Sequence, residues 1–525
     1  MRHLDRYFAR REEGGVSWGT RIGRFSLPVS VALVAAVCAI GGCTLGPDYV
    51  RPSAVTPNAF RFAGDVPATP ASESTLTPLP AWWKSFGDAD LDALVDEGLA
   101  ANHDLRIATA RVEAFSAQVV VTGAQGLPQV GYGASAARQK VSSSTTALPP
   151  GSSGIGENYT AMVSASWELD LWGRLRRENE AARANLLATE QARLGVALTV
   201  VSSIVTGYIT LLDLDRQLEI SQATLEGRKS SVDVFKMRLE GGAVSEFEMM
   251  QVTAEYETAA AAIPTLQQAI AQQEHALSIL VGRNPGPIVR RHTLEQLTQP
   301  PVPAGLPSDL IARRPDILQA EQQLVAANAA IGVARTLYFP SISLTAAAGT
   351  ASRELNTLFT GPSRTWSFAG QLAGPLFAGG SIAALNQQAR AQHDQAVEAY
   401  QLSIQNAFRD VDDALATIKA KRELVVVLER QVTALTRAVE LTRERYDNGY
   451  TDYLEVLDTE RSLFNSQLSL SSAQGDKYQA LVSLYRALGG DWIDQVAPLP
   501  VAQQPPEHGH VSNAVNSPVA KAGSQ

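Results

Sequence analysis

Residues 397–446 read VEAYQLSIQNAFRDVDDALATIKAKRELVVVLERQVTALTRAVELTRERY. Every seventh residue of this stretch is apolar or aromatic: Val397, Ile404, Val411, Ile418, Val425, Val432, Val439 and Tyr446. No Gly or Pro interrupts the chain between Gly380 and Gly449. An apolar period of 3.5 residues kept over this length predicts a helix packed beside others in a left-handed supercoil. From about Ile382 to Tyr446 it would be on the order of 95 Å long, too long for the core of a compact enzyme.

The long helix is predicted to occur twice. Gly242 aligns with Gly449 and Glu248 with Glu455, both 207 positions apart. The same shift moves the seam residues from Ile404 to Tyr446 onto seven residues that are all apolar: Ala197, Ile204, Leu211, Leu218, Leu225, Val232 and Leu239. Such internal similarity indicates a duplicated structural unit. The expected bounds are 82–305 and 306–492 for the two repeats, and about 174–240 and 381–447 for their long helices.

Two segments with a period of two precede each long helix. The clearest carries apolar residues at alternate positions: Tyr159, Ala161, Val163, Ala165, Trp167 and Leu169. Alternation over about ten residues, with aromatic residues near the ends, is typical of a transmembrane β-strand. Taken alone, each hairpin could equally cap a coiled coil in water. The expected strands are about 128–140, 159–169, 340–349 and 365–376.

The N-terminus has the residue pattern of a lipoprotein signal peptide. Six Arg precede an apolar run from Phe25 to Gly42, and that run ends in Ile40-Gly41-Gly42-Cys43. This end resembles the lipobox of bacterial lipoproteins, so we expect cleavage after residue 42 and a covalent lipid, palmitate included, on Cys43. The alternative is a single membrane-anchoring helix. An extended Pro-containing arm at 43–81 and a disordered tail at 493–525 complete the expected organisation.

Four strands cannot close a barrel, and open strand edges are not tolerated in lipid. Several copies of the chain must therefore share one barrel, with the long helices outside the membrane. The sequence predicts an α+β membrane protein built as a ring-shaped homo-oligomer.

Other classes of function find little support. The net charge of −9 and the lack of a basic cluster outside the first residues disfavour nucleic-acid binding. The two cysteines, Cys38 and Cys43, exclude a Cys-built zinc site in the body of the chain. No arrangement of Ser, His and Asp indicates catalysis, so we predict a protein that is not an enzyme and needs no metal or cofactor.

Several ordered motifs resemble one family: the outer-membrane efflux factors of the TolC/NodT lipoprotein type. The matching stretches are LGPDYVRP (45–52), WWKSFGDADLDALV (82–95), WELDLWGR (167–174), ARRPDI (312–317), GPLFAGG (374–380) and YDNGYTDYLEVLDTERSLF (446–464). The resemblance implies a homotrimer in the outer membrane. Four strands from each protomer form a transmembrane β-barrel, continuous with a periplasmic α-helical barrel. A mixed equatorial domain is expected at residues 282–306 and after Leu488.

The resemblance also implies function and partners. Such a protein is the passive exit duct of a tripartite efflux system. It carries drugs and toxic compounds from an RND-type inner-membrane transporter, with a periplasmic adaptor, the membrane fusion protein, between them. The sequence leaves two alternatives open: a duct for type I protein secretion, and a structural lipoprotein stalk without a channel.

The candidate site residues lie at the periplasmic tip. By resemblance, Glu455 and Asp458 narrow the mouth, Tyr446 helps to hold the tip closed, and Arg461 could bridge to a neighbouring acid. Glu248 is a further candidate, by position in the first repeat. Spacing alone is more typical of a solvated helix face, and only the resemblance favours the aperture instead.

The tip turns are the expected contacts for the adaptor. Their glycines are Gly241, Gly242 and Gly449, residues that permit the positive φ of a tight reversal.

Overall fold

The computed structural model describes residues 44–53, 56–57, 59–62, 81–142, 144, 153–300, 302 and 307–489. The predicted signal peptide, Cys43 and the C-terminal tail lie outside these residues.

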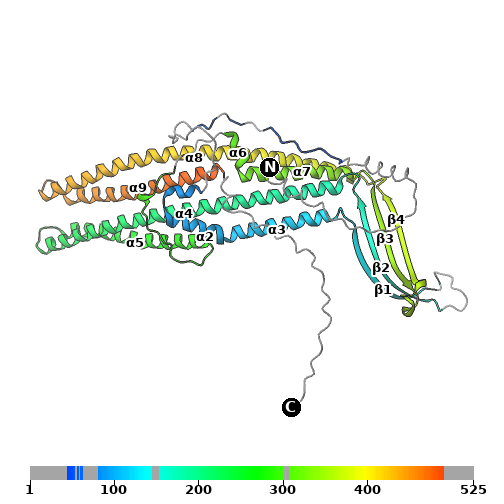
Figure 1. Ribbon diagram of the computed structural model, residues 1–525. Coiled ribbons are helices and arrows are strands. Elements are labelled where there is room, and N and C mark those ends of the chain that lie inside the picture. Colours follow the sequence, from blue (N-terminus) through cyan, green and yellow to red (C-terminus); the bar gives the residue numbers. More distant parts are fainter. Residues whose placement is uncertain are drawn as a thin grey trace, which may run out of the picture.

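The molecule is elongated, with a sheet at one end and two helical hairpins at the other (Figure 1). The first repeat contains η1 (Trp82–Phe86), α2 (Ala89–Ala101), α3 (His103–Ala124), β1 (Gln129–Lys140), β2 (Ile155–Leu169), α4 (Arg174–Glu240), α5 (Glu246–Leu280) and η2 (Leu294–Gln296). The second contains α6 (Pro307–Arg313), α7 (Pro315–Thr336), β3 (Ser341–Ser352), η3 (Leu355–Thr357), η4 (Gly361–Ser363), β4 (Arg364–Ala373), α8 (Ser381–Asp447) and α9 (Tyr453–Ala487). The predicted duplicated order of helix, two strands and long helix is confirmed.

The two long helices, α4 and α8, have the same length of 67 residues. Each is flanked near the sheet by a shorter helix, α3 or α7, and towards the tip by α5 or α9 (Figure 1). The heptad seam supplies the packing: Ile204, Leu211 and Ile418 have no exposed surface. An apolar window of α4 is long enough to cross a membrane, but 61% of it is buried within the protein. Its hydrophobicity is therefore that of a core helix.

Local signals set the helix ends. Asp88 caps α2 by accepting from the backbone N–H of Asp90 at 2.9 Å, and Asn102 caps α3 through Leu105 N at 2.9 Å. Pro315 occupies the first turn of α7, where its missing N–H costs nothing.

The four strands form one antiparallel sheet in the order β1-β2-β3-β4. Three bounds differ from those expected by three or more residues. β2 begins at Ile155, four residues earlier, and β3 continues to Ser352, three residues further. β4 ends at Ala373, three residues before the expected end. Side-chain alternation fades at Gly156 and Asn158, but their backbones still pair with Gln139 and Ala137. Ladder hydrogen bonds need no particular side chain, so the strand is longer than its pattern.

A core at mid-height joins the two repeats. Trp82 stacks on Tyr485 of α9 with ring centroids 5.0 Å apart, and Phe86 packs near Tyr478. The hydroxyl of Tyr478 donates to the carbonyl of Leu297 at 2.8 Å, which ties the segment after α5 to α9. This segment lies within the range predicted for the equatorial domain.

Candidate functional site in the strand sheet and the helical tip

One face of the sheet is apolar on all four strands. The register places Tyr132 beside Val163, Val163 beside Ala348, and Ala348 beside Trp366. Tyr132 and Trp366 are 93% and 81% exposed. The opposite face carries mainly Ser, Thr, Gly, Ala and Gln. An exposed apolar face of this extent suits contact with lipid, and a polar face suits a water-filled lumen.

The sheet has two open edges. β1 and β4 each pair on one side only among the described residues. Unpaired backbone groups cannot remain in hydrocarbon, so these edges need partner strands.

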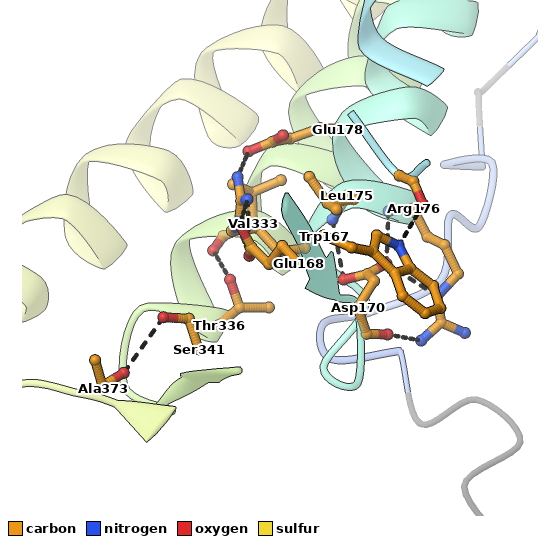
Figure 2. A network of polar contacts seen from close by, with 12 residues as sticks. Trp167, Glu168, Asp170, Leu175, Arg176, Glu178, Val333, Thr336, Ser341 and Ala373 are labelled. Carbon is orange, nitrogen blue, oxygen red and sulfur yellow. Dashed lines mark hydrogen bonds and ion pairs between the residues drawn. The ribbon is translucent and has the colours of Figure 1, made fainter. Parts of the chain in front are cut away.

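A polar network fixes the junction between β2 and α4 (Figure 2). Arg174 pairs with Glu168 at the end of β2 and with Glu178 one helical turn on, both at 2.8 Å. Asp170 accepts from the backbone N–H groups of Leu175 at 3.1 Å and Arg176 at 2.9 Å, so its carboxylate caps α4. The strand and the helix are therefore held as one unit where the sheet meets the helices.

The N-terminal described residues reach the same junction. The backbone N–H of Leu45 donates to the carbonyl of Trp172 at 3.1 Å. A Cβ built on Gly173 would lie 3.0 Å from the Cα of Thr44, so the chain passes close to that glycine. Further on, Glu321 of α7 is buried and accepts from Arg51 Nε at 2.6 Å. The chain that follows Cys43 in sequence is thus attached beside the base of the sheet.

At the other end of the molecule, the two helical turns have the same backbone. In the first, Ala243 N donates to Arg238 O at 2.8 Å, and Gly242 N to Leu239 O at 2.9 Å. The equivalent bonds in the second turn, Tyr450 N to Arg445 O and Gly449 N to Tyr446 O, measure 2.8 and 2.9 Å. Both are Schellman motifs.

The glycines of these turns are not equivalent. Gly242 and Gly449 have φ of +72° and +75°, as predicted. Gly241 has φ of −78°, an ordinary helical value, so the expectation of a positive φ there was wrong. It is the last position with helical geometry, one residue before the reversal.

Two of the predicted acids occupy the third position of their helices. Glu248 accepts from the backbone N–H of Ser245 at 2.7 Å, and Ser245 Oγ accepts from Glu248 N at 3.2 Å. This is a capping box, and the hydrogen bonds from the backbone and then the hydroxyl of Ser245 lower the pKa of Glu248. Glu455 accepts from the hydroxyl of Thr451, and its own N–H donates to Asp452 at 3.3 Å. The capping box alone accounts for a glutamate at this position, whether or not the side chain lines an aperture. A role of Glu248 in narrowing the aperture therefore stays a prediction.

Asp458 and Arg461 form an ion pair on one face of α9, and both side chains are more than half exposed. Arg461 therefore has an acidic partner within its own chain. Because the pair is exposed to solvent, it contributes little to stability and leaves the carboxylate accessible.

Tyr446 joins the two hairpins. Its hydroxyl accepts from Arg238 Nη1 of α4 at 2.7 Å, and its ring centroid lies 5.0 Å from that of Tyr453. Phe235 of α4 packs on Tyr453 at 4.3 Å. Burial raises the pKa of Tyr453, so its hydroxyl stays protonated at neutral pH.

The sequence reasoning missed Arg238, Phe235 and Tyr453. One signal was available, because Phe235 lies three residues after Val232 and so occupies the second apolar position of the heptad.

The family model described as outer membrane efflux protein matches residues 94–283 and 306–490. The chain belongs to the outer membrane efflux protein family. Its relative SrpC, the solvent efflux pump outer membrane protein of Pseudomonas putida, is 37% identical over 474 residues, which cover 89% of this chain and 98% of that protein. CusC, the cation efflux system protein of Escherichia coli strain K12, is 34% identical over 469 residues, 88% of this chain and 98% of CusC. The open-state crystal structure of the Neisseria gonorrhoeae MtrE outer membrane channel matches with a TM-score of 0.76 at 30% identity, covering 86% of this chain and 99% of MtrE.

Membership of this efflux family confirms the predicted class of function. The protein is an outer-membrane efflux channel of Gram-negative type, and it is a transport protein rather than an enzyme. The described part of the chain contains no group of three or more His, Cys, Asp or Glu side chains arranged to hold a metal ion.

Proposed function

We propose that the channel is a homotrimer in which three four-stranded sheets close one barrel of twelve strands in the outer membrane. The single observation that carries this proposal is the sheet, which has an apolar band on one face across all four strands and is open at both edges. A barrel removes the edges, turns the apolar face to lipid and the polar face to a lumen. The long helices then surround the same axis in the periplasm.

The proposed duct receives its cargo from an RND-type inner-membrane transporter through a periplasmic adaptor, the membrane fusion protein. Exposed apolar side chains flank the first turn, among them Met237 and Phe247, which supports a protein contact there. The contact includes the turn residues Gly241, Gly242 and Gly449. The relative SrpC is a solvent efflux pump protein and the relative CusC is a cation efflux system protein. Both therefore favour small-molecule cargo over protein secretion.

The aperture is proposed to lie at the second tip. Three copies each of Glu455 and Asp458 around the axis form a ring that attracts cations, and the contact of Tyr446 with Arg238 holds the second hairpin against the first. Arg461 balances Asp458 within each protomer. Glu248 belongs to the same proposal as a lesser contributor, since its carboxylate is engaged by Ser245.

Cys43 is proposed to carry the lipid. The residues after it are attached at the junction of β2 and α4, the level where barrel and periplasm would meet. A lipid at this position would enter the inner leaflet beside the barrel. Mass spectrometry of the mature N-terminus tests this: a chain beginning at Cys43 with added acyl mass is expected, and an unmodified N-terminus would exclude the lipid.

The duct itself is tested by native mass spectrometry and planar-bilayer recordings on the purified full-length protein. We expect an assembly of three chains that dissociates on heating and conducts in discrete steps. A monomer without conductance would instead support the structural stalk.

A further inference from the structure

Basic residues continue the apolar face of the sheet at the end remote from the helices. On β1, Arg138 and Lys140 follow Ala136 in steps of two, and on β4, Arg364 lies two residues from Trp366. Steps of two keep side chains on one face of a strand. All three basic residues are exposed. They therefore lie on the face that meets lipid, and not in the lumen.

Their height along the barrel matches the edge of the membrane. Arg138 lies nine residues from the start of β1 at Gln129, and Arg364 nine residues from the end of β4 at Ala373. Nine residues extend about 30 Å along a strand, or about 23 Å along the axis of a barrel with strands tilted by about 40°. The apolar band of such barrels is about 25 Å tall, so these side chains reach the headgroups of the outer leaflet.

The strands that carry them are the two open edges of the sheet. If the barrel closes as proposed above, β4 of one protomer meets β1 of the next. Arg364 then lies on the strand next to Arg138 and Lys140 of the neighbour, and a cluster of three positive charges forms at each junction.

Acidic groups offset this charge only in part. Arg138 Nε lies 3.3 Å from Glu157, its register partner on β2. Within the described residues, Lys140 and Arg364 have no ion-pair partner. Arg353 and Glu354 follow β3 at the same end and carry opposite charges. The junction therefore keeps a net positive charge.

We propose that this junction cluster binds the phosphate groups of a phosphorylated lipid in the outer leaflet. Guanidinium groups match phosphate geometry and lysine adds a point charge. Clustered basic residues at a membrane surface attract anionic lipid, and the adjoining apolar face, with Trp366 beside Arg364, accommodates its acyl chains. The proposal rests on the proposed trimeric barrel.

Native mass spectrometry of the detergent-solubilised full-length assembly tests it. The probes are bisphosphorylated lipid A, the same lipid with its phosphates removed, and inorganic phosphate in excess as a competitor. We expect the wild type to bind the bisphosphorylated lipid about tenfold more tightly than the dephosphorylated one. The variant K140Q/R364Q should lose that preference, whereas K229Q/K236Q, with the same charge change on the exposed tip of α4, should keep it. Arg138 is left intact because its loss would leave Glu157 unpaired.

Conductance of the same preparations separates this proposal from the duct. Conducting trimers without a preference for the phosphorylated lipid, or with a preference that survives in K140Q/R364Q, would overturn the lipid site and leave the duct standing. Displacement of the lipid by inorganic phosphate would also overturn it, because the site would then be a simple anion site. A non-conducting monomer would overturn both proposals.

Discussion

The two helical tips share a backbone and differ in their surfaces. Both turns close through the same pair of hydrogen bonds around a glycine with positive φ. At the offset of 207 positions, the first tip has Met237 where the second has Glu444, and Gln251 where the second has Asp458. Met237 and Phe247 are 64% and 70% exposed. Duplication kept the turn, while the second tip has acids at these two positions. Exposed apolar side chains remain on both tips, since Leu454, the counterpart of Phe247, is 54% exposed.

This difference suggests a division of labour. Exposed apolar side chains favour a lasting protein contact. Charged side chains tolerate water on every side, so a wall that carries them can move without exposing hydrophobic surface. The first tip therefore fits the larger share of the docking contact, to which Gly449 of the second tip also belongs. The acids of the second tip fit a moving aperture, and the variants below test that aperture.

The largest effect is expected from E455A/D458A. In the proposed trimer this removes six carboxylates from the proposed ring, which shortens the side chains at its mouth and removes its attraction for cations. Single-channel conductance in planar bilayers should rise several-fold, and block by divalent cations should weaken. The control is E219A on α4, which removes an acid paired with Arg216 at the same i,i+3 spacing but 21 residues before the helix ends. Unchanged conductance in E455A/D458A would reject the aperture assignment.

The next effect concerns the link between the tips. R238A removes the hydrogen bond to Tyr446 and the cation–π contacts with Phe235 and Tyr446, whereas Y446F removes only the hydroxyl. A hydrogen bond and a cation–π contact each contribute about 1 kcal/mol, so the open probability should rise about fivefold in Y446F and more in R238A. Channel recordings measure both.

The matched control for this link is R445A. Arg445 is the counterpart of Arg238 at the offset of 207 and is exposed. The double variant R238A/Y446F should resemble R238A, because both changes remove the same bond. An additive double variant, or an equal effect of R445A, would show that the link does not hold the second tip.

The residues of this link show where sequence reasoning succeeds and where it stops. Periodicity is a property of one element, so the heptad predicted α8 and the alternation predicted the sheet. The register between Arg238 and Tyr446 depends on how two hairpins pack, and no local pattern encodes it. Periodicity placed Tyr446 in the heptad seam, and the family resemblance gave it a role in holding the tip closed, but neither identified Arg238 as its partner.

The acids illustrate a different limit. Ser245 and Glu248 have the S-x-x-E spacing of a capping box, so the cap could have been read from the sequence. A glutamate at this position satisfies the backbone whether or not it faces a lumen. The capping role of Glu248 can therefore be inferred from the sequence around it. A contribution of Glu248 to an aperture depends on how several chains are arranged, which the local sequence does not specify.

The caps themselves give a smaller effect. S245A should destabilise the first hairpin by about 1 kcal/mol, because it removes an N-cap side chain. The pKa of Glu248 is lowered in the folded state, so its stabilising effect is present at neutral pH and lost as the pH falls below the ordinary value of 4.5 and through the folded value. Hydrogen exchange at the first amides of α5 reports both changes.

D452A is the counterpart in the second hairpin and should accelerate exchange at the start of α9 instead. If S245A also accelerated exchange in the second tip, the two caps would not act independently. If the protection of the first amides of α5 did not decrease as the pH is lowered, ionised Glu248 would not stabilise the helix.

The smallest effect comes from a pair of neighbouring glycines. An alanine at Gly242 would meet no atom within 4 Å, so the cost of G242A comes from the positive φ alone, about 1 kcal/mol. At Gly241, φ is −78° and a Cβ would contact Met237 O at 3.4 Å, an ordinary distance. G241A should therefore be neutral or stabilise the hairpin by about 0.5 kcal/mol, by restricting the unfolded chain. Hydrogen exchange in the first tip measures the difference, and G449A should repeat the cost of G242A in the second. Equal costs for G241A and G242A would mean that the positive φ of Gly242 does not determine the cost of an alanine in this turn. The shared backbone geometry of the two tips would then not explain their stability.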